Sequence, residues 1–211
     1  MDLLLQLSDS LQQGNAQKAA ELTQQAINTN LDVKKILDNG LISGMTIVGE
    51  KFKAHEIFLP DVLLAAKAMY AGMDLIKPLM LKEGIPTLGK VVIGTVQGDL
   101  HDIGKNLVAI MLKGAGFEVI DLGNDVSPER FISTAEKENA DVIGMSALLT
   151  TTMPVMKKVI DLAKEMQVYG KKKFIVGGAP LSTEYAKEIG AHAYCFDGMS
   201  AVEAAKRFVR I

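Results

Sequence analysis

The sequence contains a single cysteine, only three histidines and nearly balanced charges, and each of these shortages excludes a class of protein. Cys195 alone cannot form an internal disulfide framework. A net charge of −2 gives no electrostatic footprint for nucleic acid or for an anionic membrane, so we expect neither as a partner. No hydrophobic run reaches the length of a membrane span. The start, "MDLLLQLSDS", lacks the basic region of a signal peptide, which predicts a cytoplasmic protein.

The first 84 residues have apolar positions at helical spacing. The four segments that show it are "LLLQLSDSLQQ", "AQKAAELTQQAINT", "DVKKILDNGLISGMTIVGEKF" and "PDVLLAAKAMYAGMDLIKPLMLK". Four helices joined by short loops predict a small helical bundle, which we expect to form a separate domain over residues 1–84. The segment "GIPTLG", residues 84–89, has the composition of a linker.

From residue 85 onward, short β-rich runs alternate with helical ones. The expected strands are "KVVIGTV", "FEVIDLG", "DVIGMSAL", "KFIVGGA" and "HAYCF". This alternation predicts an α/β domain over residues 85–211, a five-stranded parallel sheet with helices on both faces. We expect the Rossmann-like, flavodoxin-like strand order 2-1-3-4-5, in which ligands bind beyond the carboxyl ends of the strands, between the first and the third.

Three segments of unusual composition follow strands one, three and four. The first, "GTVQGDLHDIGKN", carries Asp99 and His101 between two glycines. A segment rich in serine, leucine and threonine follows strand three, and Gly177-Gly178 follow strand four. Because the carboxyl ends of parallel strands share one edge of a sheet, we expect these three segments to meet there.

A histidine near a carboxylate is the arrangement of a metal ligand whose partner fixes its tautomer. Zinc would need at least three protein ligands, but His55 lies in the helical half, and His192 and Cys195 belong to strand five. A single protein ligand suffices if the metal brings its other ligands with it, as in a macrocycle.

Alone, each segment has a simpler interpretation: a polar turn, a threonine helix cap and a glycine turn. The loop lacks the glycine pattern of a dinucleotide site.

The three segments together match a family signature. In order, they are Asp99-x-His101-x-x-Gly104, then 41 residues (105–145), Ser146-x-Leu148, then 28 residues (149–176), and Gly177-Gly178. This pattern resembles the cobalamin-binding signature of corrinoid methyltransferases. Residues 44–62 resemble the helical cap segment of cobalamin-dependent methionine synthase. The whole chain resembles the small stand-alone corrinoid proteins of methylotrophic and acetogenic methyltransferase systems.

The resemblance implies a cobalamin or related corrinoid as cofactor, with His101 as the lower axial ligand of its cobalt. Asp99 would hydrogen-bond the other imidazole nitrogen, and Thr152 would stand where methionine synthase continues the relay with a serine. Phe52 and Leu59 match residues that cover the methyl face of the corrin. The other cofactor contacts that it implies are Gly98, Leu100, Asp102, Ile103, Gly104, Ser146, Leu148, Thr150, Gly177 and Gly178.

The resemblance also implies a methyl carrier, which is not a complete enzyme alone. Its cobalt would accept a methyl group as Co(I) from a substrate-specific methyltransferase. As methyl-Co(III) it would donate that group to a second methyltransferase, acting on tetrahydrofolate or a thiol, and a reductive activase would be a further partner. Two alternatives remain: the small subunit of an adenosylcobalamin mutase, against which the helical cap argues, and a cobalamin sensor, for which no output domain is present. The methyl donor is not encoded in this chain.

Overall fold

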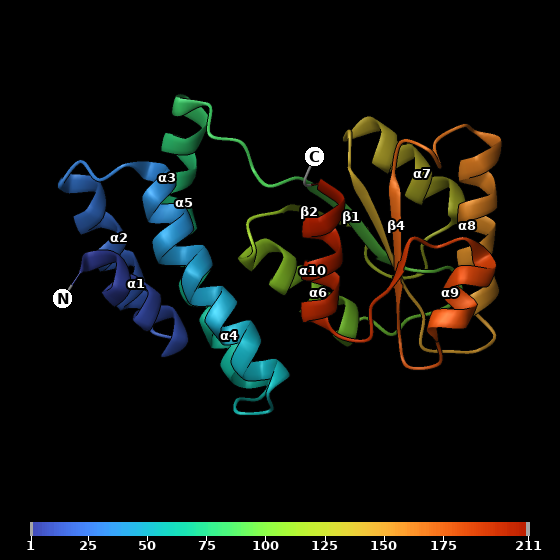
Figure 1. Cartoon of the computed structure of the whole chain (residues 1–211), viewed down its shortest axis with the longest axis horizontal. Coiled ribbons are helices and arrows are strands. Elements are labelled where there is room, and N and C mark those ends of the chain that lie inside the picture. The colour runs from blue at the N-terminus through green and yellow to red at the C-terminus, as the bar shows by residue number, and fades with distance from the viewer. Residues whose placement is uncertain (1, 210–211) are drawn as a thin grey trace. The chain divides into compact units, whose positions relative to one another are not determined.

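The computed structural model describes residues 2–209, which form two compact units (Figure 1). Residues up to Pro86 make the helical unit, and most of the chain from Thr87 onward makes the sheet unit. The division falls within the segment "GIPTLG", which contains no helix or strand.

The helical unit consists of four helical rods, as the periodicity predicted. Its elements are α1 (Leu3–Gln12), α2 (Ala16–Asn28), α3 (Val33–Lys35), the π-helix η1 (Ile36–Ile42), α4 (Ser43–Lys53) and α5 (Leu59–Glu83). The third rod runs without a break from α3 through η1 into α4. Its middle contains Asn39 and Gly40, which are poor helix formers. A Cβ at Gly40 would lie 2.7 Å from Leu7 Cδ2, so the glycine lets α1 pack closely against η1.

The sheet unit has the predicted topology, with five parallel strands in the order β2-β1-β3-β4-β5. The strands are β1 (Lys90–Thr95), β2 (Glu118–Asp121), β3 (Val142–Ser146), β4 (Lys173–Gly177) and β5 (Ala193–Tyr194). The helices are α6 (Ile103–Gly114), α7 (Pro128–Lys137), α8 (Met153–Glu165), α9 (Thr183–Ile189) and α10 (Gly198–Val209). Figure 1 shows α6 and α10 on one face of the sheet and α7, α8 and α9 on the other.

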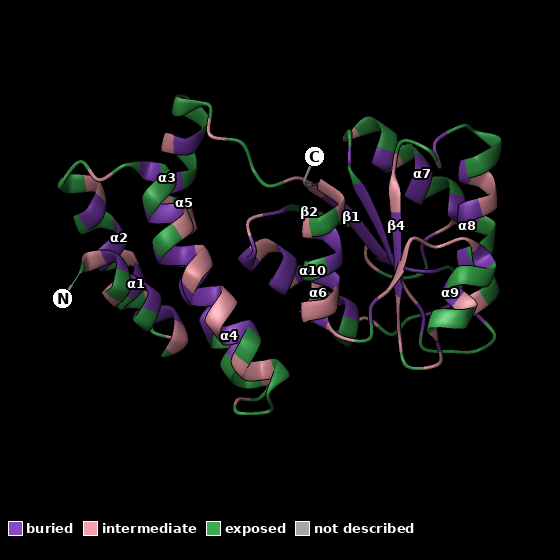
Figure 2. Ribbon diagram, viewed as in Figure 1, coloured by how far each residue is buried: buried purple, intermediate pink, exposed green. Residues whose placement is uncertain are grey.

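The central strands are almost entirely buried, which explains their continuous apolar runs (Figure 2). Phe131 and Phe174 are the largest fully buried side chains and pack in the core under α7, α8 and α9. The strand register pairs Thr95 with Ser146, and Ser146 with Gly177. The last residues of β1, β3 and β4 are therefore adjacent, and the segments that follow them start from one edge of the sheet.

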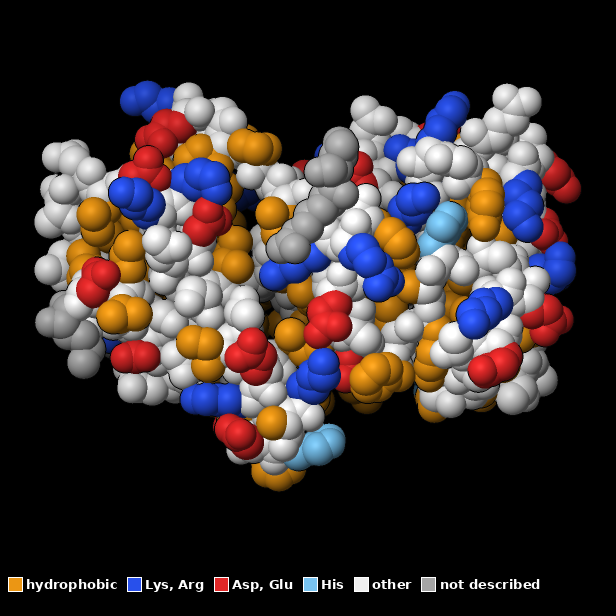
Figure 3. Space-filling model, in the orientation of Figure 1, with side chains coloured by type: hydrophobic (Ala, Val, Ile, Leu, Met, Phe, Trp, Pro, Cys, Tyr) orange, Lys and Arg blue, Asp and Glu red, His pale blue; other side chains and the backbone are white. Residues whose placement is uncertain are grey.

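The surface carries charges of both signs. On the face drawn in Figure 3, lysine and arginine side chains alternate with aspartate and glutamate side chains. Within residues 2–209, no helix combines the length and the apolar character needed to cross a membrane.

Candidate functional site

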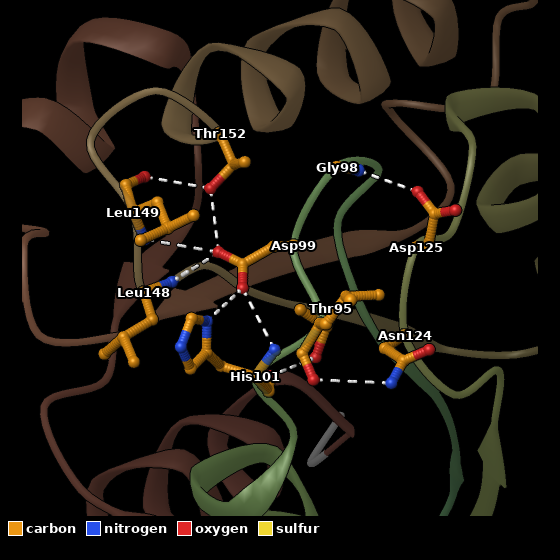
Figure 4. Close-up of polar contacts among 10 residues, drawn as sticks. Thr95, Gly98, Asp99, His101, Asn124, Asp125, Leu148, Leu149 and Thr152 are labelled. Carbon is orange, nitrogen blue, oxygen red and sulfur yellow. Dashed lines mark hydrogen bonds and ion pairs between the residues drawn. The ribbon is translucent and has the colours of Figure 1, made fainter.

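Asp99 lies at the centre of a hydrogen-bond network that joins the loops after β1 and β3 (Figure 4). Its side chain is completely buried. Oδ1 accepts hydrogen bonds from the backbone N–H of His101 at 3.1 Å and from the ring Nδ1 of His101 at 2.8 Å. Oδ2 accepts from the backbone N–H groups of Leu148 (2.8 Å) and Leu149 (3.2 Å) and from Thr152 Oγ1 (2.8 Å). The two predicted segments therefore meet at this carboxylate.

The network determines the charge of Asp99. Burial by itself raises the pKa of this carboxyl group, because it penalises the charged form. The hydrogen bonds from Leu148, His101 and Thr152 outweigh burial and hold the pKa of Asp99 well below its usual range. Asp99 is thus a carboxylate near neutral pH, and a carboxylate can only accept hydrogen bonds. We therefore assign the imidazole proton of His101 to Nδ1, which leaves the lone pair on Nε2.

The imidazole that presents Nε2 is exposed and has apolar neighbours. The side chain of His101 is 53% exposed although its partner Asp99 is fully buried. Leu100 and Ile103, on either side of it in the chain, are 69% and 73% exposed, and Leu148 and Leu149 are exposed as well. Large apolar side chains gathered around a polar group on a surface are typical of a binding site.

A bare metal ion does not fit this site. Among the described residues, no group of three or more His, Cys, Asp and Glu side chains could hold one. His192 is occupied elsewhere, since its Nδ1 accepts the N–H of Phe174 at 3.0 Å and its ring stacks on Tyr169. Strand β5 is shorter than predicted, so His192 and Cys195 flank it; Cys195 is buried, and burial raises the pKa of its thiol to about 12. The site offers one ring nitrogen, that of His101, which suits a metal that brings its other ligands with it.

Thr152 belongs to the network rather than to a helix cap. Its Oγ1 lies 2.8 Å from Asp99 Oδ2 and 2.9 Å from the carbonyl oxygen of Leu149, whereas α8 has no side-chain cap at this residue. The alternative that Thr152 merely caps α8 is therefore wrong.

Replacing Thr152 with valine should remove one donor to a buried carboxylate. We expect the free energy of unfolding to fall by about 2 kcal/mol, because hydrogen bonds to charged groups contribute about 1.5–3 kcal/mol. Urea unfolding measures this loss. Thr150→Val is the matched control, since Thr150 is exposed and lies outside the network; equal losses in the two variants would contradict the assignment.

The glycine pair after β4 meets the backbone of the chain itself. A Cβ on Gly178, whose φ is +133°, would lie 1.8 Å from the carbonyl oxygen of Ala147. A Cβ on Gly177 would lie 2.8 Å from the carbonyl oxygen of Cys195. The family resemblance implied these two glycines as cofactor contacts. The structure shows that they first allow the segments after β3, β4 and β5 to approach one another.

Most remaining predicted residues lie on the same loops. Leu100, Asp102, Ile103 and Gly104 lie between Asp99 and the first turn of α6, and Ser146 ends β3. A Cβ on Gly104 would have no atom within 4 Å, so this glycine borders open space. Phe52 and Leu59 belong to the helical unit, where they lie near the end of α4 and at the start of α5. Their relation to His101 remains a prediction.

The sequence reasoning missed the loop after β2. Asp125 Oδ1 accepts the backbone N–H of Gly98 at 2.7 Å, and the amide of Asn124 lies 3.4 Å from the carbonyl oxygen of Leu100. The signal for this loop was the tripeptide "GND", a turn composition at the carboxyl end of a strand in the same sheet.

Comparison with known proteins matches both units to families. Residues 89–206 match a B12 binding domain, and residues 3–77 match a second B12 binding domain. A corrinoid protein of Desulfitobacterium hafniense (strain Y51) is 42% identical over 212 residues, covering 99% of this chain and 98% of its own. The dimethylamine corrinoid protein of Methanosarcina barkeri is 43% identical over 210 residues, with the same coverages.

A solved structure shows the same architecture. The methanol:cobalamin methyltransferase complex MtaBC from Methanosarcina barkeri contains a chain that matches with a TM-score of 0.88 and 31% identity. The match covers 98% of this chain and 79% of that chain. The fold and the Asp99–His101 pair thus define a B12-binding protein with a helical unit. The chain belongs to the B12-binding family and, within it, to the corrinoid proteins of methyltransferase systems.

Its cofactor is accordingly a cobalamin or related corrinoid. The residues present fit that group. His101 offers a single nitrogen, exposed apolar side chains occur on the same two loops, and the space beside Gly104 is open.

Proposed function

We propose that this protein is a methyl carrier, which accepts a methyl group from a substrate-specific methyltransferase and delivers it to a second methyltransferase. The observation that supports this most is the exposed imidazole of His101 tied through Nδ1 to a fully buried carboxylate. When bound, the corrinoid supplies a cobalt centre able to take up and release a methyl group.

The residues of the site each have a distinct task. His101 would hold the corrinoid cobalt through Nε2. Asp99 orients the imidazole and raises the basicity of Nε2 through its negative charge. Thr152, with the N–H groups of Leu148 and Leu149, keeps that charge in place. Through these hydrogen bonds, Thr152 and Asp99 would set how strongly His101 binds the metal.

Apolar side chains exclude water from the reacting centre. In the sheet unit, the exposed side chains of Leu100, Ile103 and Leu148 lie on the loops that carry the site and would serve this purpose. Phe52 and Leu59 of the helical unit are the residues that we propose would cover the bound corrinoid. Phe58, in the connection between α4 and α5, is 69% exposed and would be a further apolar side chain available for this role. Exclusion of water protects a reactive methyl group and a strongly reducing metal centre.

The methyl donor is determined by the partner enzyme. Similar proteins bear names that refer to dimethylamine, trimethylamine and methanol, so this architecture serves several donors. The partners are a methyltransferase specific for one such donor, a second one that acts on tetrahydrofolate or a thiol, and a reductive activase. A mutase subunit is the second candidate, which the names of these relatives disfavour.

A methyl-transfer assay tests the proposal. The full chain, loaded with hydroxocobalamin and reduced, is mixed with a methylamine or methanol and the corresponding methyltransferase. We expect the bound corrinoid to gain a methyl group, detected by its absorption spectrum and by mass spectrometry, only when both donor and enzyme are present. An adenosyl ligand on the corrinoid purified from the native source would instead identify a mutase subunit.

A further inference from the structure

The loop after β2, residues 123–126, holds the β1 loop at the residues that flank the site. Asp125 makes two of the hydrogen bonds between these loops. Its Oδ1 accepts the N–H of Gly98 at 2.7 Å, and its own N–H donates to the carbonyl oxygen of Asp99 at 3.1 Å. Next to it, the N–H of Val126 donates to the carbonyl oxygen of Thr95 at 3.0 Å. Figure 4 shows Asp125 bonded to the start of the loop that carries Asp99 and His101.

The two hydrogen bonds made by Asp125 fix the backbone on both sides of the Asp99 side chain. Gly98 has a φ of +85° and, as a glycine, considerable freedom to rotate. The bond from its N–H to Asp125 removes that freedom immediately before Asp99. The bond to the carbonyl oxygen of Asp99 fixes the peptide that follows. The direction of the Asp99 carboxylate, and hence of the imidazole that it holds, depends on both.

Position 125 combines two requirements. Its backbone is left-handed, with a φ of +53°, which Gly, Asn and Asp tolerate best. Its side chain must also offer an oxygen within reach of the N–H of Gly98. Glycine satisfies only the first requirement, whereas asparagine satisfies both. This difference allows the hydrogen bond to be removed without disturbing the backbone conformation.

We propose that Asp125 is a positioning residue for the cobalt ligand: it acts through Gly98 and Asp99 to hold the imidazole of His101 in its ligating orientation. The proposal rests on the assignment of His101 as the axial ligand. Asp125 makes none of the contacts to the imidazole itself; those belong to Asp99.

Asp141 provides a matched control. Its Oδ2 accepts the N–H of Lys90 at 2.8 Å, and its own N–H donates to the carbonyl oxygen of Lys90 at 2.8 Å. The pattern of one side-chain acceptor and one backbone donor is thus the same as at Asp125. Lys90, however, begins β1, so this contact lies at the amino-terminal edge of the sheet, away from His101. Asp141→Ala therefore removes an equivalent bond without touching the site.

The experiment compares Asp125→Gly, Asp125→Asn and Asp141→Ala with the parent, as full chains loaded with hydroxocobalamin and reduced to Co(II). In protein grown with ¹⁵N-histidine, electron paramagnetic resonance measures the fraction of cobalt whose axial ligand is a histidine nitrogen, and thermal melting measures stability. We expect Asp125→Gly to weaken ligation by about 10-fold, at the low end of the range for groups that support a metal ligand. Asp125→Asn should match the parent. Asp141→Ala should melt earlier, yet keep the full nitrogen-ligated fraction.

Two results would overturn the positioning role. One is an Asp125→Gly protein that melts earlier but keeps the parent's nitrogen-ligated fraction, as expected for Asp141→Ala. The other is an Asp125→Asn protein as impaired in ligation as the glycine variant, since the acceptor oxygen would then be irrelevant. A parent protein without a nitrogen ligand is a different failure, because it would refute the ligand assignment on which the proposal depends.

Discussion

Replacing Gly178 with alanine should destabilise the sheet unit by about 4 kcal/mol or more, one of the largest effects that a single added methyl group can have. The new Cβ would lie 1.8 Å from the carbonyl oxygen of Ala147, and a φ of +133° is accessible almost only to glycine. Neither the segment after β3 nor β4 can move away without breaking the adjacent ladder. We expect urea unfolding to show a greatly lowered midpoint, or the soluble protein to be lost.

Gly104→Ala is the matched control for this variant. Gly104 lies in the first turn of α6 with no atom within 4 Å of its Cβ position, so alanine should be tolerated there. We expect unchanged stability or a gain of about 0.5–1 kcal/mol, since glycine is a poor helix former. A Gly178→Ala protein as stable as Gly104→Ala would mean that the close approach to Ala147 is absent in solution.

Asp99→Asn should lower the free energy of unfolding by about 3 kcal/mol and weaken axial ligation by about 10- to 100-fold. The substitution looks conservative in sequence, but both carboxylate oxygens face only donors. An asparagine must direct its NH₂ group toward one set of them. In either orientation, the NH₂ group of the asparagine would face N–H or O–H groups that now donate to the carboxylate of Asp99. The substitution also removes the negative charge beside the imidazole of His101. Urea unfolding and cobalt spectroscopy measure the two effects separately.

The pH dependence of this loss follows from the lowered pKa of Asp99. A carboxyl group whose pKa is lower in the folded state contributes stability above its unfolded pKa of about 3.9 and loses it as the pH falls toward the folded value. The difference in stability between the parent and Asp99→Asn should therefore be largest near neutral pH and shrink below about pH 4. A constant difference between Asp99→Asn and the parent across this range would contradict the lowered pKa.

The sequence predicted the elements whose pattern is repetitive. Apolar residues at helical spacing defined the four rods, and the alternation of short β-rich runs with helices defined the sheet and its order. The meeting of Asp99 with the segment after β3 was also predictable, because parallel strands bring their carboxyl ends to one edge. The register Thr95–Ser146–Gly177 shows this directly.

Other features depend on contacts that no local pattern records. The resemblance implied a relay position for Thr152, but its residues alone were equally consistent with a helix cap; the hydrogen bond to Asp99, 53 residues away in the chain, distinguishes the two. The reason for Gly178 required the position of the Ala147 carbonyl oxygen. Asp125 was missed because an Asn-Asp turn after a strand is ordinary in composition. Only the bond to Gly98 reveals what it holds.

The central claim is that Nε2 of His101, with Nδ1 tied to Asp99, is the protein ligand of the corrinoid cobalt. Electron paramagnetic resonance of the Co(II) form tests it most directly, in protein grown with ¹⁵N-histidine and in His101→Ala. If the ligand is His101, the triplet splitting from ¹⁴N should become a doublet in the labelled protein and should disappear in His101→Ala, which still contains labelled His55 and His192. A triplet that survives histidine labelling, or an unchanged splitting in His101→Ala, would contradict the account.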